Sequence, residues 1–188
     1  MNRRRWIIAT GVLCVLLALA VFVRRHVQTQ GDRDRVVAYL RALKADVELH
    51  PEKSQSLDKI RAILNGRWGF DRMYACGVLG ELGPKARPAI PDLIAALNCG
   101  DGVVERESAR AIGEIALGDP RPVEALIREV KLARGDVSWF SAEALGNIGE
   151  PALSAIPVLE KAALSTDDNM VYSAQEALKK LRELQAKP

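Results

Sequence analysis

The sequence predicts an all-α protein, an α-solenoid of stacked two-helix repeats behind one hydrophobic N-terminal segment. Apolar residues make up 48% of the 188 residues, but aromatic residues make up only 5%. Alanine and leucine therefore fill the core, which suits thin, closely packed helices better than a β-sandwich. In addition, a pattern of small and apolar residues returns every 33 residues without a gap, which is typical of repeat architectures.

Two motifs carry the 33-residue period. The first motif is a run of small and apolar residues in one helix of each repeat. The second motif contains the apolar stripe of the other helix of that repeat. When the same period is extended toward the N-terminus, residues 56–65 align with residues 89–98, which indicates a divergent opening repeat. Copies of the first motif are residues 75–80, 108–113, 141–146 and 174–179, and copies of the second are residues 89–94, 122–127 and 155–160.

Each repeat is expected to contain two helices. Apolar residues at i, i+3, i+4 and i+7 give each helix one buried stripe, as at Ile90, Leu93, Ile94 and Leu97. Prolines stand at helix starts, where a missing N–H costs little. One pair of helices cannot bury its stripe alone, so neighbouring repeats must share a continuous core. The expected helices are 72–83, 88–98, 105–117, 121–133, 138–149, 154–164 and 169–185.

Three glycines recur at one register in the first helix of each repeat. Gly80, Gly113 and Gly146 fall in mid-helix, where glycine costs about 1 kcal/mol relative to alanine. Their recurrence indicates a close approach between helices rather than a ligand site. In the last repeat Lys179 takes the place of the glycine, and a charged run follows it, so this half-repeat is expected to be a solvated cap.

The expected organisation has three parts. Residues 1–26 form an N-terminal signal-anchor or transmembrane segment with its helix at 6–23, residues 27–32 form a short linker, and residues 33–188 form the repeat domain. The repeat domain is divided into 33–69 (divergent opening repeat), 70–102, 103–135, 136–168 and 169–188 (terminal half-repeat).

The N-terminal segment predicts a single-pass membrane protein. Residues 7–23 contain no charge and no proline, and as a helix they would span about 25 Å, near the lower limit for a bilayer core of about 30 Å. The alternative is a signal peptide cleaved near Ala20, because Ala18-Leu19-Ala20 matches the small-residue cleavage pattern. A short tail with three arginines, Arg3 to Arg5, translocates reluctantly, so the domain is expected outside the cytoplasm.

The charge distribution excludes a nucleic-acid partner. Five of the 27 basic residues flank the hydrophobic segment, and no acidic residue precedes Asp32. The remaining 22 basic and 24 acidic residues give the repeat domain a net charge of −2. Binding to nucleic-acid phosphates requires a basic patch, which this balance does not provide.

No arrangement of side chains indicates catalysis, a metal or a cofactor. The three cysteines, Cys14, Cys76 and Cys99, are scattered and have no metal-site spacing. Cys76 aligns with two alanines and is expected to be a packing residue. The only histidines are His26 and His50. We therefore expect no catalytic, metal-binding or cofactor-binding residue, and no small-molecule substrate.

The motifs resemble HEAT repeats, in particular the short subclass found in phycobilisome-lyase-like proteins. The resemblance rests on residues 80–86, 89–97 and 144–146, and it covers about residues 70–185 well and 33–69 weakly. It implies a right-handed solenoid whose second helices line the inner face. It says little about function, because one fold hosts many functions.

Two enzymatic relatives are disfavoured. Deoxyhypusine hydroxylases, which the repeat type resembles, bind two irons through His-Glu pairs at the start of the first helices. Glu107 is the only acidic residue at the matching positions here, and none of them holds a histidine, an expected iron ligand. Bilin lyases resemble the chain in repeat type, but no group of residues in this sequence indicates that it shares their chemistry. The matching pairs are Met73-Tyr74, Arg106-Glu107, Trp139-Phe140 and Tyr172-Ser173.

These observations favour a membrane-tethered protein-interaction or scaffold module without catalytic activity. The alternatives are a secreted or periplasmic binding protein after cleavage near Ala20, and an enzyme of the bilin-lyase or metal-dependent hydroxylase type. Two surfaces are candidates for contact with a protein partner. The first is the inner face of the solenoid, which the second helices line and where Asp92, Arg128, Lys131 and Lys161 face solvent. The second is an aromatic edge at the starts of the first helices, with Tyr74, Trp139, Phe140 and Tyr172.

Overall fold

A computed structural model describes residues 30–51 and 55–186. The expected membrane segment at 6–23 lies outside the described residues. The chain divides into two compact units, Met1–Ala38 and Tyr39–Pro188. Residues 30–49 are helical, and Asp32 pairs with Arg35 one turn later at 3.7 Å. Among the described residues, no helix is both long enough and apolar enough to span a bilayer.

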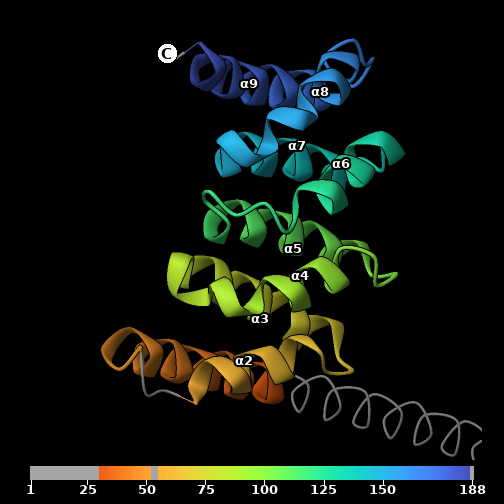
Figure 1. Cartoon of the computed structure of the whole chain (residues 1–188). Helices are drawn as coiled ribbons and strands as arrows, with labels where there is room; N and C mark the ends of the chain where they lie inside the picture. Colours follow the sequence, from red (N-terminus) through yellow and green to blue (C-terminus); the bar gives the residue numbers. More distant parts are fainter. Residues whose placement is uncertain (1–29, 52–54, 187–188) are drawn as a thin grey trace, which may run out of the picture. The chain divides into compact units, whose positions relative to one another are not determined.

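The second unit is a stack of helices (Figure 1). Short 3₁₀ helices join the two α-helices of a repeat in two places, and the described residues contain no strand. After the helical residues 39–49, the elements are α2 (Ser56–Leu64), α3 (Gly69–Leu82), η1 (Gly83–Ala89), α4 (Ile90–Ala96), α5 (Gly102–Ile115), α6 (Val123–Leu132), α7 (Asp136–Ile148), η2 (Glu150–Ala155), α8 (Ile156–Ala162) and α9 (Asp168–Gln185).

All seven expected helices are confirmed, with shifted ends. The first helices of the repeats begin one to three residues earlier than expected, and at α5 and α9 an aspartate before the apolar pattern caps the helix. Asp101 caps α5 by accepting hydrogen bonds from the backbone N–H groups of Val103 and Val104, at 3.1 and 3.3 Å. The α-helical parts of α4 and α8 begin two residues later than expected, because the chain first turns through η1 and η2.

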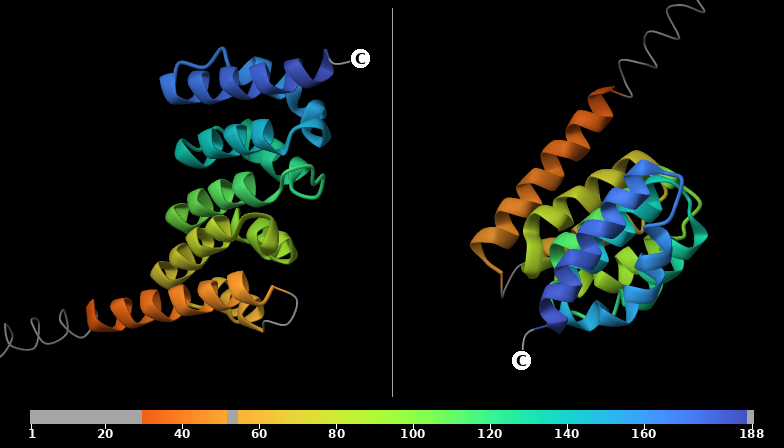
Figure 2. Two further views of the ribbon diagram at one scale, coloured as in Figure 1. Left: turned by 90° about the vertical axis from the view of Figure 1, so that its left-hand side faces the viewer. Right: turned by 90° about the horizontal axis from the view of Figure 1, so that it is seen from above.

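The helices form two layers. The A layer contains α3, α5, α7 and α9, which pack successively on one another (Figure 2, left). The B layer contains α2, α4, α6 and α8, each joined to the A helix that follows it. Apolar side chains from equivalent positions of successive repeats meet between the layers and are fully buried. They are Leu79, Ile112 and Leu145 from the A layer, and Leu93, Leu126 and Leu159 from the B layer.

Successive A helices approach most closely at the recurrent glycines, as expected. A Cβ atom on Gly113 would lie 3.0 Å from Ala144 Cα, and one on Gly146 would lie 2.8 Å from Ala177 Cα. Both distances are shorter than van der Waals contact, and both involve backbone atoms that cannot move aside cheaply. At Gly80 the corresponding backbone distance is 3.4 Å. We call this row of glycine–alanine contacts the A-layer seam.

We predict that Gly146→Ala lowers the free energy of unfolding by about 1–2 kcal/mol. Overpacking costs about 1–3 kcal/mol, and the gain in helix propensity of about 1 kcal/mol offsets part of it. Gly77→Ala is the matched control, since a Cβ there would meet only the end of the Arg110 side chain, at 3.7 Å. This control should stabilise the protein by about 0.5–1 kcal/mol. Urea unfolding of the full chain, followed by circular dichroism, measures both, and equal effects would contradict the seam.

Candidate functional site

The outward face of the B layer carries three exposed basic side chains. Arg128 and Lys131 lie on α6 and Lys161 lies on α8. Asp92, expected on the same face, is instead engaged between helices: its carboxylate accepts hydrogen bonds from Arg61 Nε at 2.6 Å and Asn65 Nδ2 at 2.8 Å. Its side chain is only 17% exposed. Asp92 therefore links α2 to α4, because Arg61 of α2 and Asn65, which directly follows α2, reach across to its helix.

Two exposed leucines stand beside these basic residues. Leu132, the last residue of α6, is 53% exposed, and Leu164, just after α8, is 85% exposed. The two helices contact one another. We call Arg128, Lys131, Leu132, Lys161 and Leu164 the α6–α8 patch. Exposed apolar side chains rimmed by polar ones are typical of interaction sites.

Sequence reasoning missed these leucines, although a signal was present. Leu132 lies outside the apolar stripe of its helix, and the equivalent residue one repeat later is Ser165. Leu164 occupies the position that Lys131 holds one repeat earlier. A leucine at a register that is polar in a neighbouring repeat indicates a surface position.

The four residues of the expected aromatic edge have different environments. Tyr74 packs against Phe70 with ring centroids 4.9 Å apart. Trp139 Nε1 donates a hydrogen bond to Asp167 Oδ2 at 3.0 Å, which ties α7 to the turn before α9. Phe140 is half-buried, whereas Tyr172 is 68% exposed. Of the four, Tyr172 is thus the one most open to a partner.

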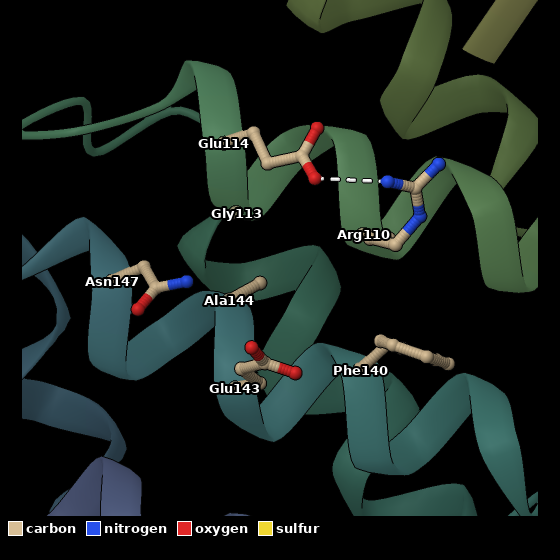
Figure 3. Close-up of a pocket in the computed structure, with 7 residues that line it drawn as sticks. All are labelled: Arg110, Gly113, Glu114, Phe140, Glu143, Ala144 and Asn147. Carbon is tan, nitrogen blue, oxygen red and sulfur yellow. Dashed lines mark hydrogen bonds and ion pairs between the residues drawn. The ribbon is translucent and has the colours of Figure 1, made fainter. Parts of the chain in front are cut away.

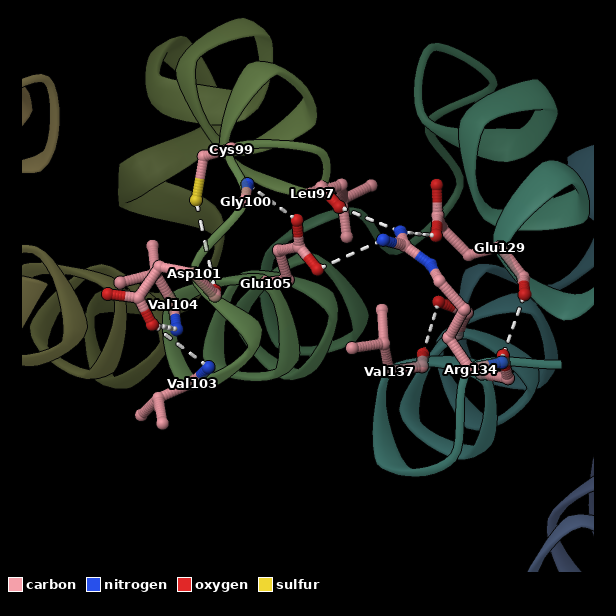
Figure 4. A network of polar contacts seen from close by, with 12 residues as sticks. Leu97, Cys99, Gly100, Asp101, Val103, Val104, Glu105, Glu129, Arg134 and Val137 are labelled. Carbon is pink, nitrogen blue, oxygen red and sulfur yellow. Dashed lines mark hydrogen bonds and ion pairs between the residues drawn. The ribbon is translucent and has the colours of Figure 1, made fainter. Parts of the chain in front are cut away.

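A largely buried network of charges joins the two helices of repeat 103–135 (Figure 4). Glu129 is fully buried and Glu105 nearly so. Arg134 bridges them, donating to Glu129 Oε2 from Nη2 and to Glu105 Oε2 from Nη1 at 3.2 Å. The hydrogen bond with Glu129 raises the pKa of Arg134, so the guanidinium stays charged. Glu105 also accepts a hydrogen bond from the Gly100 backbone N–H at 2.9 Å.

The loop that presents Arg134 has an unusual backbone. Ala133 is left-handed at φ 52° and ψ 44°, a conformation that alanine adopts only at a cost. It ends α6 and turns the chain so that Arg134 faces the two carboxylates. The sequence analysis did not identify this network, although a signal was present. Glu129 occupies a position at which the neighbouring repeats have a small residue, Ala96 and Ala162.

We predict that Arg134→Leu lowers the free energy of unfolding by about 2–3 kcal/mol, because two buried carboxylates lose their shared cation. The loss is at the lower end for a buried pair, since the Arg134 side chain is 35% exposed. Adding Glu129→Ala to this variant should recover part of the stability, because it removes the buried charge. Chemical unfolding of the three proteins tests this, and a double variant less stable than Arg134→Leu would contradict it.

Two hollows lie between successive A helices. The hollow between α5 and α7 measures about 40 Å³ and is drawn in Figure 3. The hollow between α7 and α9 measures about 160 Å³ and is lined by Glu143, Tyr172, Ser173, Glu176, Ala177 and Lys180. Small-molecule pockets usually measure about 300–1,000 Å³, so neither hollow has the size of a substrate or cofactor site.

The described residues offer no group of three or more His, Cys, Asp or Glu side chains that could hold a metal ion. Cys76 is fully buried, as expected for a packing residue. Burial, and then the nearby charge of Glu107, raise the pKa of its thiol to about 12, which keeps it protonated and unreactive.

Comparison with known proteins agrees with this architecture. Residues 90–179 match the family of HEAT repeats. No curated protein is similar to the chain. A crystal structure of an engineered protein, a target of the Northeast Structural Genomics Consortium, is 24% identical with a TM-score of 0.59, over 77% of this chain and 67% of that one.

A second solved structure is the complex of CpcE and CpcF of phycocyanin lyase from Nostoc sp. PCC7120. It is 23% identical to this chain with a TM-score of 0.62, and the match covers 80% of this chain and 65% of that one. Identities this low show the fold alone. The matched family and the stacked helix pairs agree with the motifs at the level of fold: the chain is an all-α stack of helices, and its residues 90–179 match HEAT repeats.

Proposed function

We propose that the protein is a protein-interaction module without catalytic activity, that residues 6–23 hold it at a membrane, and that the α6–α8 patch contacts its partner. The observation that carries the proposal is the pair of exposed leucines beside Arg128, Lys131 and Lys161. A stack of repeats offers an extended surface for another macromolecule. Leucines so exposed gain free energy when a partner covers them.

The charges of the patch favour an acidic partner. Glu124 on α6 and Glu160 on α8 are the exposed acidic side chains of these two helices, and the buried Glu129, 3.8 Å from Arg128, is also paired with Arg134. Glu160 is already paired with Arg182 of α9 at 2.6 Å. The patch therefore has an excess of positive charge, and it complements a protein surface that combines carboxylates with apolar side chains.

An enzymatic role has less support. Glu107, the one acidic residue at the positions where hydroxylases hold iron ligands, is paired with Arg106 at 3.3 Å and with Arg110 at 2.8 Å. The phycocyanin lyase complex resembles the chain at the level of fold only. A secreted or periplasmic binding protein, released by cleavage near Ala20, remains the alternative to a tethered module with its repeats outside the cytoplasm.

We predict that the triple variant Arg128→Gln, Lys131→Glu, Lys161→Glu lowers recovery of the native partner from membranes at least tenfold. Glutamine is chosen at position 128 because Arg128 Nε lies 3.8 Å from the buried Glu129 carboxylate, where a new negative charge would destabilise the fold. A control with the same charge change, Arg41→Gln, Lys59→Glu, Lys179→Glu, should recover the partner normally.

The measurement is affinity capture from native membranes with quantitative mass spectrometry, alongside the thermal midpoint of each variant. Unchanged recovery with the patch variant would refute the assignment. If Tyr172→Ala then abolished recovery in a folded protein, the partner would bind the aromatic edge instead. Membrane fractionation, together with the N-terminal residue of the mature protein, separates the tethered module from the secreted alternative.

We also expect the purified full chain to carry no stoichiometric metal. Its two histidines lie outside the clear repeats, and the described residues offer no ligand cluster. Elemental analysis checks this, and one tightly bound equivalent of iron or zinc per chain would support an enzyme of the hydroxylase type.

A further inference from the structure

Each B helix is joined to the next A helix by a turn, and these turns lie along one edge of the stack (Figure 1). Outside the α6–α8 patch, the turns before α3 and α5 carry exposed apolar side chains. Trp68, just before α3, is 67% exposed, and Val103, in the first turn of α5, is also exposed. The two turns touch, because a Cβ atom on Gly69 would overlap the side chain of Asp101. Trp68 and Val103 therefore belong to one surface.

A cation accompanies the exposed tryptophan. The guanidinium carbon of Arg67 lies 5.6 Å from the centre of the Trp68 ring. In these two turns, residues 65–68 and 97–101, Asp101 is the one acidic residue, and its Oδ1 atom already accepts two backbone hydrogen bonds as the cap of α5. Tryptophan has an apolar body and one polar N–H group, so beside a cation it suits the boundary between water and lipid.

The start of the A helix is apolar in the early repeats and polar in the later ones. In steps of 33 residues, Phe70 and Val103 are followed by Asp136 and Asn169 at the same position. Asp136 and Asp168 are exposed. Carboxylates disfavour contact with anionic headgroups and with hydrocarbon. A lipid surface therefore fits the turns before α3 and α5 better than the later turns.

The chain enters the second unit toward the same edge. Tyr39, the first residue of that unit, is half exposed. Residues 39–49 run beside α3, because Lys44 Nζ pairs with Glu81 Oε2, next to the last residue of α3, at 2.7 Å, and the following helical turn contacts η1. Tyr39 precedes Lys44 in this helix, so it lies toward the start of α3, the end that Trp68 precedes.

We propose that Tyr39, Arg67, Trp68 and Val103, which we call the early turn edge, rest on the lipid surface of the bilayer that residues 6–23 enter. The inference rests on the proposed function, because that segment brings the edge to the membrane. The intervening residues 24–38 reach at most about 50 Å when fully extended, so they keep the edge near the headgroups.

The apolar atoms of three side chains gain free energy when lipid covers them. This gain is too small to bind a free domain, but a tether raises the effective concentration of the edge at the bilayer, so the contact orients the stack. Docking through the early repeats leaves the later ones exposed. The α6–α8 patch shares no residue with the early turn edge, so a protein partner has access to it while the edge contacts lipid.

Trp68 itself reports the contact. In the full chain with Trp6→Phe and Trp139→Phe it is the one remaining tryptophan. The protein is reconstituted into vesicles of three parts phosphatidylcholine to one part phosphatidylglycerol, and the phosphatidylcholine is then replaced by a form with bromine on one acyl chain, which quenches tryptophan on contact. Bromine should lower the fluorescence of Trp68 at least twofold. Fluorescence that bromine leaves unchanged would overturn the proposal.

Val103→Asp tests the surface without changing the reporter. It introduces the residue that the next repeat holds at this position, Asp136, and an aspartate in the first turn of a helix is compatible with folding. This variant should reduce the quenching of Trp68 at least twofold. The matched control is Leu117→Asp, at an exposed leucine in the turn between α5 and α6 on the opposite edge, and it should leave the quenching unchanged. Equal quenching in the two variants would refute the contact.

The outcome is separable from that of the proposed function, because Trp6 reports the tether. A chain with Trp68→Phe and Trp139→Phe keeps Trp6 as its one tryptophan. If bromine quenches Trp6 but not Trp68, the tether stands and the docking of the early turn edge is refuted. If bromine quenches neither, both the tether and the docking are wrong.

Discussion

The A-layer seam is the contact on which the rest of the structure depends. Glycine in one helix and alanine in the next let two backbones meet so closely that a Cβ atom on Gly113 or Gly146 would lie within 3.0 Å of the facing alanine Cα. This contact recurs at one register, so it fixes the spacing of successive repeats. Each glycine within a helix lowers the stability of that helix. The burial of apolar side chains, which close packing allows, offsets this loss of stability.

The same seam explains where the charged side chains of the A layer lie. Backbones in contact leave no room for side chains at the seam, so charged residues on either side of it line the outer hollows. Whether a hollow is filled then depends on a few substitutions, such as Ser173 at the register of Phe140. The seam also ends at a definite place, because Lys179 stands where the next glycine would be needed. A further helix could not approach α9 as closely, so α9 is suited to be a cap.

The fold was largely predictable from the sequence, and the candidate surfaces only in part. The 33-residue period placed the seven helices, and the recurrent glycines indicated the seam, because both depend on local patterns that repeat. The environment of Asp92 was not predictable, because its partners lie 27 and 31 residues away. The charged network depends on the left-handed backbone conformation of Ala133, and no sequence motif indicates this conformation. Both the network and the exposed leucines break the repeat register, so comparison of registers could have indicated them.

The most direct test of the account is a double-mutant cycle across the seam, with Gly146→Ala, Ala177→Gly and the two combined, measured as free energies of unfolding of the full chain. The account predicts that Gly146→Ala is destabilising in both backgrounds, by about 1–2 kcal/mol in the unmodified chain and by less with Ala177→Gly, because the added methyl group would lie 2.8 Å from the Cα atom at 177, which glycine keeps, and 3.0 Å from the Cβ atom, which glycine lacks. A Gly146→Ala substitution that does not destabilise the chain in either background would contradict the seam as the constraint that spaces the repeats.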